Sequence, residues 1–162
     1  MAKETRHLLQ YNLLILVALI SLGCLSIMSV LAPICEEYKL YNLSNLFYRF
    51  LSNFCHQYPS RSLWLLNRPM GLCARCFSMY SAFPIALLVI YFIKARWTYL
   101  FNLMLLMPLI VDGFSQYLYL TESNNYVRFG SGVLFGIGAA GLYEHILIDI
   151  LFEARNKQHS IL

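Results

Sequence analysis

The chain has 162 residues, of which 59% are hydrophobic and only 12% are charged. A soluble globular domain carries roughly a quarter charged residues, so this composition excludes a soluble globule and favours a single domain whose surface faces lipid. The formal net charge of +4 is small and its lysines and arginines flank hydrophobic runs instead of forming one block, so we expect no nucleic-acid partner.

The first element in chain order is a predicted membrane-spanning helix over residues 8–32. Gln10, Asn12 and a few serines are the only breaks in this hydrophobic run, and about 25 residues at a rise of 1.5 Å each suffice to cross a bilayer. A secretory signal peptide has an apolar region of roughly 7–15 residues. Because this run is longer and leads into Pro33, we expect a retained helix.

An amphipathic helix is predicted over residues 40–55, within the one long connection of residues 33–72. Its apolar residues share one helical face: Leu40, Leu43, Leu46, Phe47, Phe50, Leu51 and Phe54. Such a helix lies at the membrane interface or caps the bundle. Pro59 cannot continue it, and residues 67–71 are typical of a turn that leads to Cys73.

Three more membrane-spanning helices are predicted over residues 76–93, 98–120 and 126–152. Tyrosines and tryptophans gather near the ends of the spans, as in an aromatic belt: Tyr11, Trp97, Tyr99, Tyr119 and Tyr126. The sequence therefore predicts an all-α polytopic membrane protein with four transmembrane helices plus the amphipathic helix. With four spans, both termini lie on one side, and the long connection and the turn at 121–125 lie on the other.

The orientation in the cell membrane is indicated by the basic residues. Termini inside would place six of them in short cytoplasmic segments: Lys3, Arg6, Lys94, Arg96, Arg155 and Lys157. The other six fall on the opposite side, mostly spread through the long connection. The raw counts tie, but the higher charge density of the short segments favours cytoplasmic termini.

A cysteine-histidine pattern in the long connection predicts a metal site. Cys55-His56 is followed, after sixteen intervening residues, by Cys73-Ala-Arg-Cys76. Zinc favours four tetrahedral thiolate and imidazole ligands, and a C-x-x-C pair supplies two thiolates from one turn. We expect zinc or another transition metal to be bound by Cys55, His56, Cys73 and Cys76, with Cys35 as another partner for Cys55.

The same cysteines are also compatible with thiol chemistry. A C-x-x-C pair exchanges disulfides, and on the outer side Cys73–Cys76 and Cys35–Cys55 would form two pairs. The layout resembles the bacterial disulfide-bond oxidoreductases that pass electrons to quinone, although their second external cysteine pair has no counterpart in residues 121–125. A third reading is a structural staple in a subunit of a larger membrane complex.

Polar residues in the third and fourth spans predict a second part of the site. Asp112 and Gln116 lie one helical turn apart, and a carboxylate at this depth needs a partner, for which Arg128 is the candidate. Ser123 and Asn124 are candidates for the same network and for cofactor binding. Gly132 and Gly136 form a G-x-x-x-G face that predicts close helix packing.

Two further arginines bracket the cysteine motif. Arg61 and Arg75 either bind an anion such as a lipid phosphate or extend to the headgroups. The candidate catalytic residues are therefore Asp112, Gln116, Arg128, Arg61 and Arg75.

Together these motifs resemble a family of small polytopic bacterial and archaeal membrane proteins of unknown function. The resemblance covers roughly residues 50–140 and depends on Cys55-His56-Gln57, Arg61-Ser62, Cys73-Ala-Arg-Cys76, Pro108, Asp112-Gly-x-x-Gln116, Ser123-Asn124 with Arg128, and Gly132 with Gly136. It implies that the cysteine cluster and the third-span polar cluster belong to one site.

The leading hypothesis is a metal-binding membrane protein, either a transporter of a small molecule, ion or lipid or a membrane metalloenzyme. The alternatives are a thiol-disulfide oxidoreductase that uses Cys73–Cys76 and a quinone, and a structural subunit. The sequence alone leaves open whether the protein is an enzyme, and it does not indicate the substrate or the oligomeric state.

Overall fold

The computed structural model describes residues 2–94, 97–118 and 122–153. Four of its helices are long and apolar enough to cross a membrane: α1 (Ala2–Glu37), α3 (Ala74–Ile93), α4 (Tyr99–Tyr117) and α5 (Asn125–Ile148), which continues into the short helical segment Asp149–Glu153. Many large apolar side chains on these helices are exposed, as a lipid-facing surface requires. The predicted class, four apolar helices able to span a membrane, is confirmed.

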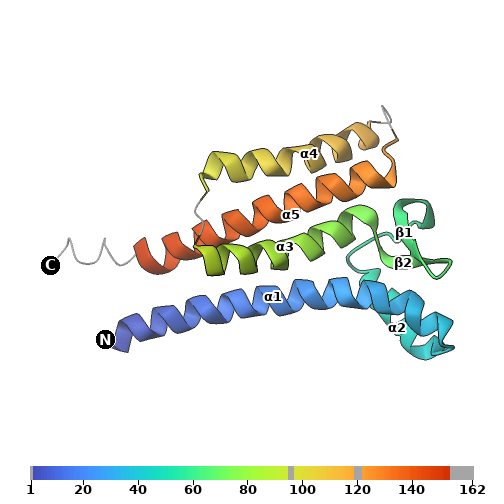
Figure 1. Ribbon diagram of the computed structural model, residues 1–162, viewed down its shortest axis with the longest axis horizontal. Coiled ribbons are helices and arrows are strands. Elements are labelled where there is room, and N and C mark those ends of the chain that lie inside the picture. Colours follow the sequence, from blue (N-terminus) through green and yellow to red (C-terminus); the bar gives the residue numbers. More distant parts are fainter. Residues whose placement is uncertain (1, 95–96, 119–121, 154–162) are drawn as a thin grey trace.

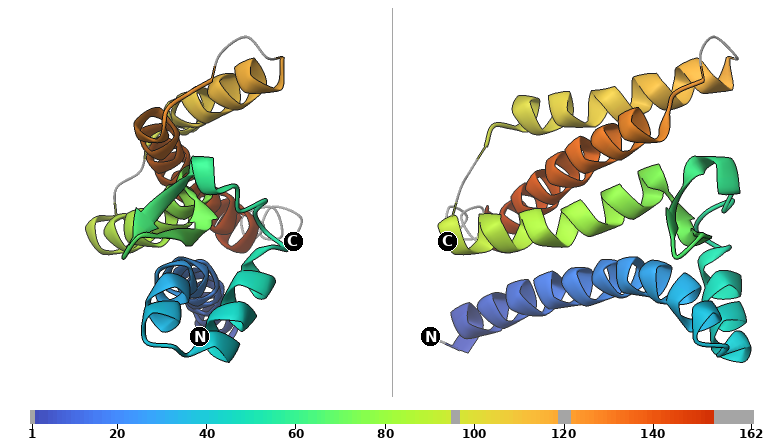
Figure 2. Two further views of the ribbon diagram at one scale, coloured as in Figure 1. Left: turned by 90° about the vertical axis from the view of Figure 1, so that its right-hand side faces the viewer. Right: turned by 45° about the vertical axis from the view of Figure 1, so that its right-hand side comes forward.

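The order in which the helices lie side by side differs from their order in the sequence. In Figure 1, α1 lies beside α3, α5 follows, and α4 packs on the side of α5 that faces away from α1. Figure 2 shows the same order in two other views. The N-terminus and the C-terminal end of α5 lie at one end of the bundle, and the long connection lies at the other.

Glycines on α5 set how closely its neighbours approach. A Cβ on Gly136 would come within 2.7 Å of the Met79 carbonyl oxygen on α3, and one on Gly138 within 2.6 Å of the Asn102 carbonyl oxygen on α4. A Cβ on Gly132 would also meet the backbone of α3. The predicted small-residue packing is therefore present, and it serves two faces of α5 at once.

The first helix extends beyond the predicted span at both ends. It starts at Ala2 and runs through Pro33 to Glu37. The proline removes one helical hydrogen bond but does not end the helix here. Its last turns are held by the connection: the Ser44 hydroxyl donates to the Ala32 carbonyl at 2.9 Å, and Arg68 pairs with Glu36.

The amphipathic helix, α2 (Tyr41–Leu51), is shorter than predicted. The side chains of Ser52 and Asn53 donate to the Arg49 carbonyl at 2.7 Å and the Phe50 carbonyl at 2.9 Å. These bonds satisfy the last carbonyls of the helix and end it. The predicted apolar face is largely exposed, which suits a helix that lies at a membrane interface.

A β-hairpin replaces the loop that the sequence suggested between α2 and α3. After a short 3-10 turn (Pro59–Arg61), β1 (Ser62–Leu65) pairs antiparallel with β2 (Arg68–Cys73). The two linking residues, Leu66 and Asn67, both have positive φ angles, 53° and 58°, as a two-residue hairpin turn that follows strand twist requires. Leu66 is not a usual residue there, so the turn was not recognisable from composition.

The hairpin is anchored to α2 by a phenol. The Tyr48 hydroxyl donates to the Pro69 carbonyl at 2.7 Å. Burial, with Glu36 nearby, raises the pKa of Tyr48 to about 12, so the hydroxyl stays protonated and remains a donor. This bond holds β2 in place against α2, and the last residue of β2 is Cys73, the first cysteine of the C-x-x-C pair.

Candidate functional site

Three cysteines that are distant in sequence converge at the connection end of the bundle. The sulfurs of Cys55, Cys73 and Cys76 all lie within 4.8 Å of one another. Cys55 follows α2, Cys73 is the N-cap of α3, and Cys76 lies in its first turn. Thiolates that share a tetrahedral zinc ion at 2.3 Å stand about 3.8 Å apart, so each pair of sulfurs would need to approach by at most about 1 Å.

Gln57 holds the segment that carries Cys55. Its side-chain amide donates to the carbonyls of Tyr48 and Gly71, both at 2.8 Å, and its own backbone has a φ of 52°. The backbone N–H of Cys73 donates to the Cys55 sulfur at 3.3 Å. These bonds bring the end of α2 against the end of β2, which places the thiols together.

The three thiols differ in their readiness to ionise. The pKa of Cys55 is lowered, because the thiols of Cys73 and Cys76 and the N–H of Cys73 all donate to its sulfur. The pKa of Cys73 is raised, because its proton is held by Cys55 and because burial disfavours a second thiolate. The hydrogen bonds therefore favour the thiolate at Cys55 over one at Cys73, and a bound cation would favour thiolates at all three positions.

His56 does not join the thiols in the structure. Its ring is exposed and stacks on Tyr58, with centroids 5.9 Å apart and planes 8° apart. Within the described residues, the group of candidate ligands contains the three cysteines only, without His56 or Cys35. All five cysteines are free thiols. A ligand role for His56 stays a prediction.

A polar network lies beside the cysteines and joins α3 to α4. Arg75, between the cysteines of the C-x-x-C pair, forms an ion pair with Asp112 and donates to the Ser123 hydroxyl at 3.2 Å. Gln116 donates to the same hydroxyl. The structure thus brings together Asp112, Gln116 and Ser123, as predicted, but the cation beside Asp112 is Arg75 and not Arg128.

Arg128 is instead linked to the β-hairpin through Asn125. It is 7% exposed, and its Nη1 donates to the Asn125 side-chain oxygen at 3.0 Å. The Asn125 amide in turn donates to the Ser62 carbonyl of β1 at 3.2 Å. The neighbouring Asn124 caps α5 by accepting from the Val127 N–H at 2.9 Å. Its exposed side chain is used for helix initiation.

A cavity of about 200 Å³ opens beside the three thiols. It is lined by Phe54, Cys55, His56, Gln57, Tyr58, Arg61, Cys73, Arg75, Cys76 and Arg128. Sequence reasoning missed Tyr58, which stacks with His56 and lies under the Arg61 guanidinium, 5.4 Å from its carbon to the ring centroid. It also gave no role to Gln57, although that residue stands in the same motif as Cys55.

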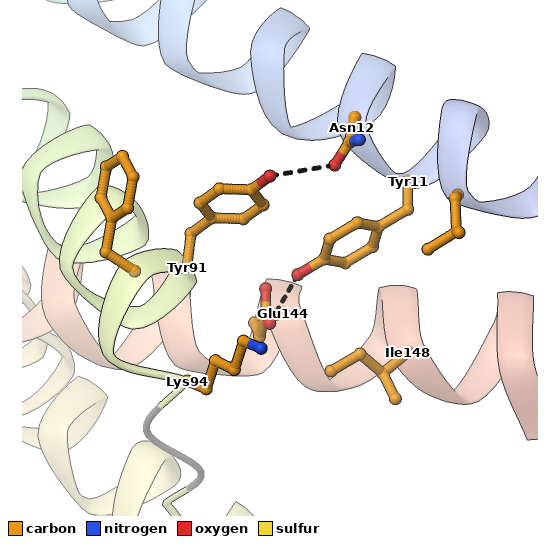
Figure 3. Close-up of a pocket in the computed structure, with 8 residues that line it drawn as sticks. Tyr11, Asn12, Tyr91, Lys94, Glu144 and Ile148 are labelled. Atoms are coloured by element: carbon orange, nitrogen blue, oxygen red, sulfur yellow. Dashed lines mark hydrogen bonds between the residues drawn. The ribbon is translucent and has the colours of Figure 1, made fainter.

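A second cavity, of about 730 Å³, lies at the opposite end of the bundle (Figure 3). Tyr11 of α1 donates to the Glu144 carboxylate of α5 at 2.7 Å, and Tyr91 of α3 donates to Asn12 at 3.3 Å. The other carboxylate oxygen of Glu144 is buried without a partner. These bonds tie α1 to α3 and α5 at the end that carries the termini.

Comparisons with known proteins point to the same part of the chain. The model of a family described as "Predicted membrane protein (DUF2085)" matches residues 55–142, which include the three clustered cysteines and the polar network of Arg75, Asp112, Gln116 and Ser123. An uncharacterized protein, MJ1492, of Methanocaldococcus jannaschii is 29% identical over 119 residues, 68% of this chain and 74% of that protein. Another from Methanothermobacter thermautotrophicus is 32% identical over 102 residues, 59% of this chain and 92% of that protein. No solved structure matches the chain.

Proposed function

The chain belongs to the predicted membrane protein family DUF2085, and we propose that it is a membrane metalloprotein with one resident zinc-like ion held by Cys55, Cys73 and Cys76. The observation that carries the proposal is the convergence of three thiols within 4.8 Å from two separate segments. A redox pair or a structural disulfide needs two sulfurs, whereas a third sulfur at the same point has a use as a metal ligand.

The position of the thiols supports this proposal. Cys73 and Cys76 stand at the N-terminus of α3, where unpaired backbone N–H groups and the helix dipole favour negative charge. Three thiolates around a divalent ion carry one net negative charge, which this helix end stabilises. Three thiolate ligands also leave a fourth tetrahedral position for water or substrate, as in catalytic zinc sites.

A resident ion fits the structure better than a transported one. In the described part of the chain, these cysteines are the one group of three or more candidate metal ligands, whereas a path across the membrane would need further binding sites. The substrate would therefore meet the ion at the membrane face, next to Arg75, Asp112, Ser123 and Gln116. With cytoplasmic termini, that face is the outer one.

A second candidate function is thiol-disulfide oxidoreduction. The lowered pKa of Cys55 favours it, because a thiolate is the attacking species in disulfide exchange. In that function two thiols would lose two electrons and two protons to a quinone and form one disulfide. The third thiol and the absence of a second cysteine pair near residues 121–125 favour the metal.

Elemental analysis with thiol counting on detergent-purified protein separates these functions. We expect about one metal ion per chain, thiols that become reactive only after chelation, and loss of the metal in Cys73→Ser. Cys24→Ser is the matched control, because Cys24 is exposed in α1, and it should retain the metal. A metal-free protein whose thiols are released only by reductant would overturn the proposal in favour of disulfide chemistry.

A further inference from the structure

We propose that the cavity beside the three cysteines binds the phosphate group of an anionic ligand through Arg61, Arg75 and Arg128. The inference deepens the proposed function and rests on it for the metal ion next to the anion. The three arginines come from three separate elements, the turn before β1, the first turn of α3 and the first turn of α5. All three line the same cavity of about 200 Å³.

Two of the three arginines have hydrogen-bond donors without a partner. The Nε atoms of Arg75 and Arg128 are buried without a hydrogen-bond partner. Each guanidinium has five N–H donors, and the bonds of Arg128 that the structure shows use only its Nη1. Planar guanidinium groups match phosphate oxygens with paired hydrogen bonds, so a phosphate in the cavity would accept hydrogen bonds from the arginines that line it.

The balance of charge also favours an anion. Among the described residues, Asp112 pairs with Arg75, while no carboxylate forms an ion pair with Arg61 or Arg128. Arg128 is 7% exposed, and a cation buried at the membrane boundary needs a counterion. With a divalent ion bound, the three thiolates contribute one net negative charge and Asp112 contributes another, so the three arginines still leave a net charge of about +1 that an anion would balance.

The size of the cavity restricts the ligand. Pockets for drug-sized molecules have volumes of roughly 300–1,000 Å³, so about 200 Å³ suits a phosphate or a single headgroup. The stacked rings of Tyr58 and His56 also line the cavity. The phosphate has two sources that share this chemistry, free inorganic phosphate and the headgroup of an anionic phospholipid.

The test uses the metal-loaded full-length protein in detergent and in phospholipid nanodiscs. In detergent, phosphorus NMR measures binding of inorganic phosphate. In nanodiscs of phosphatidylcholine with or without phosphatidic acid, the same method measures immobilisation of the lipid phosphate. We expect binding in at least one arm, weakened roughly 10- to 100-fold in Arg61→Gln and Arg128→Lys. Binding in the detergent arm alone assigns free phosphate, and binding in the nanodisc arm alone assigns the lipid.

The controls separate this inference from the proposed function. Arg49→Gln removes an exposed arginine of α2 that does not line the cavity, and it should bind as wild type does. Arg61 is exposed, so Arg61→Gln keeps the test valid where a change at the buried Arg128 impairs folding. Protein that holds its metal but binds phosphate in neither arm, or that binds equally well in Arg61→Gln and Arg49→Gln, overturns the inference and leaves the metal site standing. Protein that takes up no metal ion but binds phosphate in an Arg61-dependent way overturns the proposed function instead and leaves the anion site standing.

Discussion

The guanidinium of Arg75 on α3 pairs with the carboxylate of Asp112 on α4, although α5 packs between these two helices. Arg75 stands between the two cysteines of the C-x-x-C pair, and Asp112 stands in the last turns of α4. The ion pair therefore links the first turn of α3, which carries Cys76, to α4, whose surface otherwise faces lipid. A movement of α4 that separates the two groups would displace the first turn of α3.

Asp112→Asn is expected to destabilise the protein. The side chains of Arg75 and Asp112 are 19% and 11% exposed, and removal of one partner of a buried ion pair costs about 3–5 kcal/mol because the other charge stays buried. The measurement is thermal unfolding in detergent. In a double-mutant cycle, Arg75→Gln combined with Asp112→Asn should lose less than the sum of the two single changes. Strict additivity would contradict the pairing.

Metal binding is expected to raise the unfolding temperature of the wild-type protein. A ligand at 100 times its dissociation constant stabilises the folded state by about 2.7 kcal/mol. Chelation should therefore lower the midpoint in wild type and in Cys24→Ser, and have no effect in Cys76→Ser, which has lost a ligand. An equal response to chelator in Cys76→Ser would show that the stabilising metal is bound elsewhere.

His56→Ala tests the fourth ligand position. The imidazole is exposed and stacked on Tyr58, so we expect the variant to keep its metal with an affinity within a few fold of wild type. Competition with a chromogenic chelator gives this affinity. A loss of metal as severe as in Cys73→Ser would instead make His56 the fourth ligand, as the sequence pattern predicts.

Gly136→Ala is expected to separate α5 from α3. The added methyl would meet the Met79 carbonyl oxygen at 2.7 Å and the Ala82 Cβ at 2.9 Å, and overpacking of this kind costs about 1–3 kcal/mol. Gly130→Ala is the matched control on the same helix, since nothing lies within 4 Å of its added methyl. It should be neutral or stabilising by up to about 1 kcal/mol. Equal unfolding midpoints for the two variants would argue against the helix interface.

Tyr11→Phe is expected to weaken the attachment of α1 at the end of the bundle that carries the termini. The change removes the donor to the Glu144 carboxylate, which is 8% exposed, and an unsatisfied buried acceptor costs about 1–3 kcal/mol. Thermal unfolding measures the effect. Tyr126→Phe, at a residue that is 88% exposed, should leave the midpoint unchanged, and a matching decrease in both variants would disprove a specific role for Tyr11.

The four apolar helices were predictable because bilayer thickness imposes their length and hydrophobicity residue by residue. The ends of the helices differ from the prediction: α1 reaches Glu37, where contacts with α2 and the hairpin hold its last turns. The amphipathic helix α2 stops at Leu51, where Ser52 and Asn53 bind its carbonyls. The start of α5 was readable, since Asn124 is a good N-cap. The last residues predicted for the third span, 119 and 120, lie outside the described residues.

The candidate site, too, was predictable from the sequence only in part. The C-x-x-C spacing by itself predicted that Cys73 and Cys76 could bind one ion together, and the structure places Cys73 as the extended N-cap of α3 and Cys76 in the first turn of that helix. Only the tertiary structure brought Cys55 to these two cysteines, through the hairpin and the positive φ of Gln57, and only it chose Arg75 over Arg128 as the partner of Asp112. Local spacing is encoded in the chain, whereas these pairings depend on which helix lies beside which, and that order is decided by side-chain packing between distant segments.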